Sequence, residues 1–199
     1  MITNSRNLFF VRKIQVSFYF KRKTIIQSLF FLEYMLFKTY AVKNELFLAN
    51  IKLKWLFDQI SNPNKIDKPL YFLRPLIENK KTKKYLLGLL QDFSNIIDLS
   101  ENENFFKNFK KFNSNFNKII ILLDENFVTS YRFQILQFFY VSKINKITKF
   151  KEFFFKKEKT VDVTESVFIE IFLKKCNFNL TKISKVQYLF YLLKELIKK

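Results

Sequence analysis

The residue types that usually carry enzyme chemistry are scarce in this chain of 199 residues. It contains no histidine, so the usual general base and the commonest transition-metal ligand are both missing. Cys176 is the single cysteine, which excludes an intrachain disulfide and a thiolate metal cluster. Glu101 and Glu103 lie two positions apart, so on a helix their carboxylates do not share a face. Gly88 is the single glycine, and one glycine cannot build a nucleotide-binding loop. The sequence therefore predicts no catalytic site, no cofactor and no metal site.

The composition indicates an A+T-rich organellar gene and a strongly cationic protein. Phenylalanine, lysine, asparagine and isoleucine are in excess, and their codons are rich in A and T. Lys and Arg together number 36 against 17 Asp and Glu, which gives a formal net charge of +19. Such a charge favours a polyanionic partner, either RNA or an anionic membrane surface. The alternative is that codon bias places lysine at solvated positions without a binding role.

No stretch of the sequence has the length and apolar character of a membrane span. The most apolar run, residues 25–37, is shorter than the roughly 20 residues that a bilayer requires and contains Glu33. Residues 1–24 mix arginine and lysine with aromatic residues, in a pattern that superficially resembles an organelle import signal. An organelle-encoded protein needs no such signal. We then expect residues 1–24 to form an irregular N-terminal extension that lies on a partner.

Residues 25–112 carry the apolar spacing of a helical bundle. Helices are predicted from residue 25 to about Tyr40, onward to about Ile60, and from Lys80 to Phe93. Further along, a stripe of phenylalanines at helical spacing is interpreted as core rather than as a base-stacking surface: Phe105, Phe109, Phe112 and Phe116. Residues 113–117 are rich in Asn and Ser and form the predicted hinge.

Residues 118–199 are predicted to form a small C-terminal α+β domain, which makes the overall fold class α+β. Short apolar runs and alternating apolar positions predict strands at residues 119–123, 153–155, 161–173 and 178–181. Ser184 and Gln187 fit a capping box that opens a final amphipathic helix. This C-terminal part has the features of a docking or structural unit rather than of an enzyme.

Several motifs follow one another along the chain. They are Tyr34-Met35-Leu36-Phe37 with Tyr40-Ala41, then Phe72-Leu73-Arg74-Pro75-Leu76-Ile77, then Asn95-Ile96-Ile97 with Leu99-Ser100-Glu101-Asn102, and finally Val161-Asp162, Asn179-x-Thr181 and Lys185-Val186-x-x-Leu189. In this order they resemble the motifs of the δ subunit of F-type ATP synthases, called oligomycin-sensitivity-conferring protein in mitochondria. The first looks like the opening helix of that family, the second like its Phe-Leu-x-Asn-Pro-x-Ile segment and the third like its central segment. The last three take the places of its closing motifs, although the family's glycines are replaced.

The resemblance implies signature or partner-contact positions at the matching residues. These are Tyr34, Leu36, Tyr40, Pro75, Ile77, Asn95, Glu101, Asn102, Val161, Asp162, Asn179, Thr181, Lys185 and Leu189.

The function that the resemblance implies is that of a non-catalytic stator connector, which links the catalytic head to the peripheral stalk during proton-driven ATP synthesis. Residues 25–112 would bind the N-terminal helices of the alpha subunits, and residues 118–199 would bind subunit b of the stalk. The protein would lie on the matrix side of the mitochondrial inner membrane, or on the stromal side of the thylakoid for a plastid gene. Charge and composition leave two alternatives open: an organelle-encoded ribosomal protein that binds rRNA, and a structural subunit of a respiratory complex.

Overall fold

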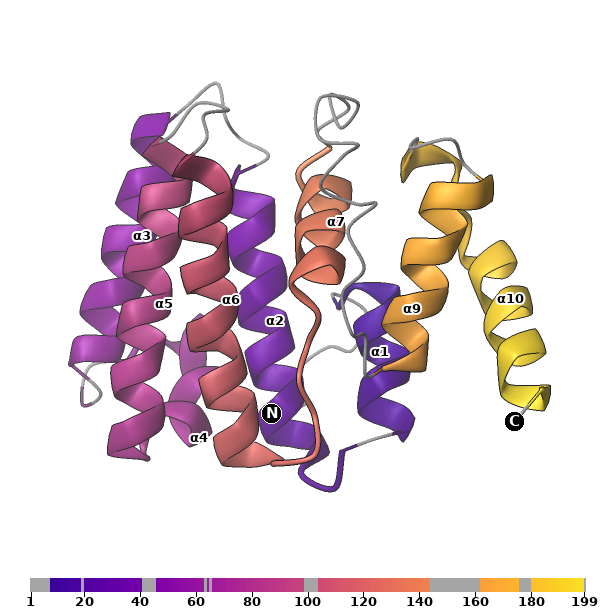
Figure 1. Ribbon diagram of the computed structural model, residues 1–199. Helices are drawn as coiled ribbons and strands as arrows, with labels where there is room; N and C mark the ends of the chain where they lie inside the picture. Colours follow the sequence, from indigo (N-terminus) through magenta and orange to yellow (C-terminus); the bar gives the residue numbers. More distant parts are fainter. Residues whose placement is uncertain are drawn as a thin grey trace.

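The fold is all-α, and the predicted α+β class is wrong. The computed structural model describes residues 8–18, 20–40, 46–62, 64, 66–98, 104–143, 162–175 and 180–198. Of these described residues, 85% are helical and none lies in a strand. The described residues of the C-terminal part, 162–175 and 180–198, therefore continue the helical architecture of the first half and form no sheet (Figure 1).

The helices pack as one row with α3 at one edge of the view and α10 at the opposite edge (Figure 1). Helix α5 packs between α3 and α6, α2 contacts α6 and α7, and α9 contacts α1, α7 and α10. The bounds are α1 Phe10–Phe18, α2 Lys23–Tyr40, α3 Leu46–Ser61, η4 Lys68–Leu73, α4 Arg74–Ile77, α5 Lys80–Asp98, α6 Asn104–Leu123, α7 Tyr131–Val141, α9 Val163–Glu170, η6 Ile171–Lys175, η7 Leu180–Lys182 and α10 Lys185–Ile197.

The predicted phenylalanine stripe on α6 forms the centre of the core, as expected. Phe109 and Phe112 are fully buried, and both rings contact the ring of Phe37 from α2. The ring of Phe109 also contacts Phe138 from α7, and the ring of Phe112 contacts Phe93 from α5. Because the stripe recurs every three to four residues, one face of α6 can bury all of it against three other helices. The interpretation of these aromatic residues as core is confirmed.

Helix α6 continues through residues 113–117, where the sequence placed a hinge, and through 119–123, where it placed a strand. The asparagines that indicated a loop have another use, because Asn113 and Asn117 donate their side-chain amides to the backbone carbonyl of Thr129. In the apolar run, Ile119 and Ile120 are buried while Ile121 faces solvent. This is the pattern of the last turns of an amphipathic helix, so the strand prediction is wrong.

The predicted strand at 161–173 is also wrong, since Val163–Glu170 is helical and the π-helical segment η6 follows. Phe168 and Phe172 are fully buried and Ile169 nearly so, which means that this helix is covered on most of its sides. A helix buried all round carries no 3.6-residue periodicity, and its sequence is then easily mistaken for a covered strand. Leu180–Lys182 is a 3₁₀ turn rather than part of a strand. Residues 153–155, Val161 and 176–179 lie outside the described residues.

The first 24 residues include an ordered helix instead of the irregular arm that was predicted. Phe10–Phe18 forms α1, and its side chains Val11, Arg12 and Gln15 are completely buried. Helix α1 packs between α2 and α9, which belong to opposite halves of the sequence. Helix α1 is therefore part of the core.

Candidate functional site

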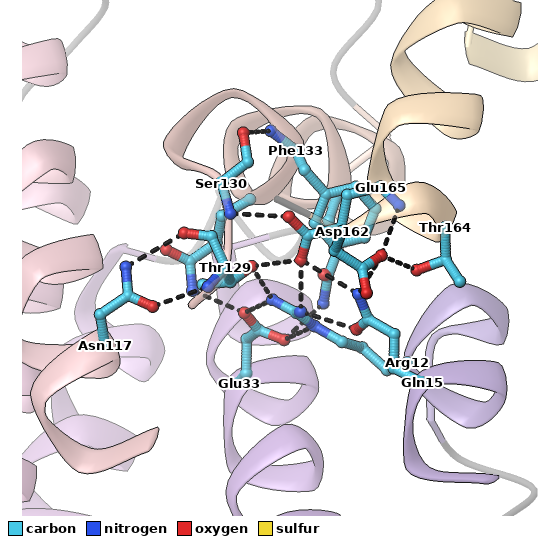
Figure 2. A network of polar contacts seen from close by, with 12 residues as sticks. Arg12, Gln15, Glu33, Asn117, Thr129, Ser130, Phe133, Asp162, Thr164 and Glu165 are labelled. Atoms are coloured by element: carbon cyan, nitrogen blue, oxygen red, sulfur yellow. Dashed lines mark hydrogen bonds and ion pairs between the residues drawn. The ribbon is translucent and has the colours of Figure 1, made fainter. Parts of the chain in front are cut away.

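One buried polar network joins the N-terminal helix to both halves of the chain, and Arg12 is its centre (Figure 2). The Arg12 guanidinium donates from Nε to Glu33 Oε2 at 2.9 Å and from Nη2 to Glu33 Oε1 at 2.8 Å. Its Nη1 donates to Glu165 Oε1 at 3.0 Å and to Gln15 Oε1, and Nη2 also donates to Thr129 Oγ1. All five N–H groups that a guanidinium offers are thereby used. The arrangement pairs one cation with two carboxylates.

The first carboxylate, Glu33 of α2, is saturated with donors. Besides the two bonds from Arg12, its Oε1 accepts from Gln134 Nε2 at 2.6 Å and its Oε2 accepts from Gln137 Nε2 at 2.8 Å. Both glutamines lie on α7. Glu33 is fully buried, so these four bonds replace the water that a carboxylate would otherwise bind.

The second carboxylate, Glu165 of α9, anchors the loop before α7. Its Oε2 accepts from the backbone N–H of Ser130 at 2.6 Å, and its Oε1 accepts from the Thr129 hydroxyl at 2.6 Å and from Gln15 Nε2. Burial raises the pKa of Glu165 to about 7, against the opposing effect of the Arg12 charge. Asp162 is the N-cap of α9, where its side chain accepts from the Glu165 backbone N–H at 2.9 Å. Its negative charge also raises the pKa of Glu165.

Aromatic rings enclose the cation. The Arg12 guanidinium carbon lies 4.4 Å from the ring centroid of Phe30 and 4.9 Å from that of Phe133. Contacts of this kind attract a desolvated cation by about 2 kcal/mol. The charge is thus stacked between rings as well as paired, and the network is closed to solvent.

A network sealed in this way fits a structural role. Arg12 and Glu33 have no exposed side-chain surface and Glu165 has almost none, so a substrate in solution cannot reach the charged atoms. Across the described ranges, Gln137 Oε1 is the one buried side-chain polar atom that lacks a hydrogen bond. Within the same ranges, no cluster of His, Cys, Asp and Glu could hold a metal ion. What the network can do is fix α1, α2, α7 and α9 in one arrangement.

The residues singled out from the sequence are dispersed over the fold. Leu36, Tyr40 and Ile77 are buried in the core, and Asp162 alone belongs to the polar network. Three are half-buried, namely Tyr34, Pro75 and Asn95. Lys185 and Leu189 are exposed on α10, and Thr181 lies in the turn η7. Glu101, Asn102, Val161 and Asn179 lie outside the described residues.

Sequence reasoning missed the members of the network, among them Arg12, Gln15, Glu33 and Glu165. A usable signal was present, since Glu33 interrupts the most apolar run of the chain. A charged residue on an apolar helix is expected to have a buried partner of opposite charge. The partner itself could not be identified, because Arg12 lies among other basic residues near the N-terminus.

Two helices expose apolar side chains to solvent. On α3, Phe47, Leu48, Ile51 and Trp55 form what we call the α3 face, with Phe47 76% exposed. Helix α10 is the amphipathic helix predicted after Ser184, but its apolar stripe points away from the core, which it contacts through Tyr188 and Leu192 instead. The α10 face consists of Val186, Leu189, Phe190, Leu193, Leu196 and Ile197, of which Ile197 is 83% exposed.

A hollow of about 360 Å³ opens between α3 and α5, beside the α3 face. Its lining is Asn50, Leu53, Lys54, Phe57, Leu90, Gln91 and Ser94. The mixture of apolar and polar side chains suits a peptide or helix side chain better than a reactive small molecule, because no acid–base pair lines it. No helix in the described part of the chain is long and apolar enough to cross a membrane.

Comparisons with protein-family models, with curated proteins and with solved structures found no match.

Proposed function

We propose that this protein is a non-catalytic connector that holds two protein partners at opposite ends of a rigid helical body. The observation that carries the proposal is the pair of exposed apolar faces, one on α3 and one on α10. The two helices lie at opposite edges of the fold (Figure 1). Contiguous exposed apolar residues of this extent mark interaction surfaces in soluble proteins.

Each face has the spacing of a helix-binding surface. Phe47, Ile51 and Trp55 are four residues apart, so they form one line along α3, and the hollow next to them can accept side chains of a docked helix. Trp55 is held in place because its indole Nε1 donates to Asp67 Oδ2 at 3.0 Å. Burying one large apolar side chain contributes about 1.5–3 kcal/mol, so a few such side chains suffice for a stable contact.

The body between the faces supports transmission of load. Arg12 and its partners tie α1, α2, α7 and α9 together, and α9 in turn carries α10. A connector under torque needs such cross-links, because helices joined by short loops alone can slide past one another.

The specific complex that we propose is the F-type ATP synthase, with this chain as its stator connector. The motifs around Tyr34, Pro75 and Asn95 support this assignment, and they lie on the helices α2, α4 and α5. The α3 face would bind the N-terminal helices of the alpha subunits, and the α10 face would bind subunit b of the peripheral stalk. The chain would act on the matrix side of the mitochondrial inner membrane, or on the stromal side of the thylakoid in a plastid.

The test is purification of the tagged protein from its organelle. We expect the wild-type chain to co-purify with ATP synthase subunits, and the exposed triple variant Phe190→Ser, Leu193→Ser, Ile197→Ser to lose the stalk subunit while keeping the alpha subunits. A matched variant of the other end, Phe47→Ser with Ile51→Ser, should give the reverse loss. Sedimentation with the organellar ribosome and not with ATP synthase would contradict the proposal.

A further inference from the structure

A third surface, distinct from the two apolar faces, concentrates positive charge on the paired helices α5 and α6. Exposed lysines cover the outer side of this pair, and we call them the lysine face: Lys80, Lys81, Lys84, Lys107, Lys110, Lys111 and Lys118. Lys118 bonds to the neutral amide of Asn115, and the partly buried Asp92 carboxylate attracts both Lys111 and Lys118. The other lysines of this face form no hydrogen bond or ion pair with a described side chain, so the surface keeps an excess of positive charge for a ligand.

The two helices lie against each other along their length, which brings the lysines into one surface. The amide of Asn115 bonds to Asp92 Oδ2 at 2.7 Å, and Lys118 Nζ lies 5.5 Å from the ring centroid of Tyr85. Gly88 permits this close approach, because a Cβ there would come within 3.2 Å of the Asn115 amide nitrogen. On α6, Lys107, Lys111 and Lys118 follow one line that spans about 16 Å at 1.5 Å per residue.

The charge of this surface is local rather than a uniform effect of codon use. The segments α5 and α6 contain eight lysines and two aspartates, a net charge of +6. The segments α3 and α10 also have many exposed positions, yet together they contain four lysines against one aspartate and one glutamate, a net charge of +2. Codon bias alone would raise lysine on every helix with exposed positions, so the difference between these pairs needs another cause.

The chemistry of the lysine face selects the phosphodiester backbone of a nucleic acid. Ammonium groups spaced along a helix neutralise phosphates without reading bases. An anionic membrane would require large apolar side chains between the lysines, and on this pair the exposed ones, Ile121 and Leu122, lie only at the end of α6. Four of the five aromatic rings of α6 are buried and the fifth, Phe106, packs against the core, so bases have no stacking platform. We propose that the lysine face binds nucleic-acid backbone without sequence preference.

This inference is independent of the connector proposal, since the α3 and α10 faces contribute none of its lysines. It assigns a binding role to +6 of the formal charge of +19, a charge that the sequence alone could attribute either to binding or to codon bias. A chain can dock protein helices with its apolar faces and phosphates with α5 and α6 at the same time.

The test compares two triple variants that lose the same charge at different places. In the face variant, Lys107, Lys110 and Lys111 are each changed to Gln; in the control, Lys182, Lys185 and Lys194 near the α10 face are changed to Gln. All six lysines are exposed, so both variants should retain the wild-type circular dichroism spectrum. Binding of a labelled short RNA duplex, and of a DNA duplex of the same sequence, is measured between about 50 and 200 mM salt.

We expect the face variant to bind at least about tenfold more weakly at about 100 mM salt, with the slope of log K against log salt reduced by about 3. The control should stay within about twofold of the wild type. RNA and DNA duplexes should give the same pattern, because the backbone is the ligand. Equal losses in both variants would overturn the proposal, since binding would then follow total charge. So would absence of binding, or lysine-face-dependent binding to phosphatidylglycerol vesicles with none to either duplex.

Discussion

Changing Arg12 to methionine would leave Glu33 and Glu165 buried without their shared cation. Methionine keeps an unbranched apolar stem of similar length, so it can occupy the space between Phe30 and Phe133. The substitution therefore removes the charge and its five hydrogen bonds while it disturbs the packing little. What remains is an electrostatic penalty that can be worked out.

The penalty at pH 7 falls mainly on Glu33. Burial already raises the pKa of Glu165 to about 7, so protonating Glu165 at pH 7 costs little free energy. A buried ion pair that loses one partner typically costs about 3–5 kcal/mol, because the remaining charge is left uncompensated. Proteins have a total stability of only about 5–15 kcal/mol.

Urea denaturation followed by far-ultraviolet circular dichroism measures the effect. Relative to wild type, we expect Arg12→Met to lose about 4 kcal/mol at pH 7. Arg22→Met is the control, because Arg22 is exposed and its loss should change stability by less than about 0.5 kcal/mol. A loss for Arg12→Met below about 1 kcal/mol would refute the reasoning.

Three further perturbations test other parts of the fold. The folded-state pKa of Glu165, about 7, lies above its ordinary value of 4.5, so the folded state holds this proton more tightly than the unfolded state. The contribution of Glu165 to the free energy of unfolding is therefore fully present below about pH 4.5 and is lost as the pH rises to 7, a decrease of up to about 3 kcal/mol. In the same denaturation series, Glu165→Gln should make the stability depend less on pH. Ser184→Ala removes the acceptor for the Gln187 backbone N–H at the start of α10 and should cost about 1 kcal/mol, whereas Ser184→Asn should not. Phe109→Ala should cost about 3–5 kcal/mol by leaving a cavity in the core, against little change for the exposed Phe47→Ala, as read from urea midpoints.

The long helices with a polar side were predictable from the sequence. Leu86, Leu89 and Phe93 recur at helical spacing between solvated lysines, and α5 buries them as expected. The same logic identified Phe109 and Phe112 as core. In these segments one side of the helix contacts solvent, which gives the apolar residues a period of 3.6 positions. The helices can therefore be predicted from the sequence pattern.

The shorter, covered segments were not predictable in this way. Helix α9 is buried on most sides, which removes the periodicity, and its apolar positions then alternated by chance as a strand would. The asparagines of α6 indicated a loop because their bonding to Thr129 depends on tertiary structure. The polar network was hidden for the same reason, since Arg12 finds its partners 21 and 153 residues away along the chain.

The bond between Arg12 and Glu165 has a consequence for the order in which the protein is assembled during synthesis. Chains grow at about 5–20 residues per second, so Glu165 is joined on the order of ten seconds after Arg12. In that interval the nascent chain contains α1 and α2, and the Arg12–Glu33 pair can form, but the second carboxylate does not yet exist. A contact of such high sequence separation is also slow to form by chain diffusion. Helix α1, which is made before the other described helices, is thus among the last of them to reach its final position, and until then its buried aromatic residue Phe10 lacks its partner rings Phe168 and Tyr188.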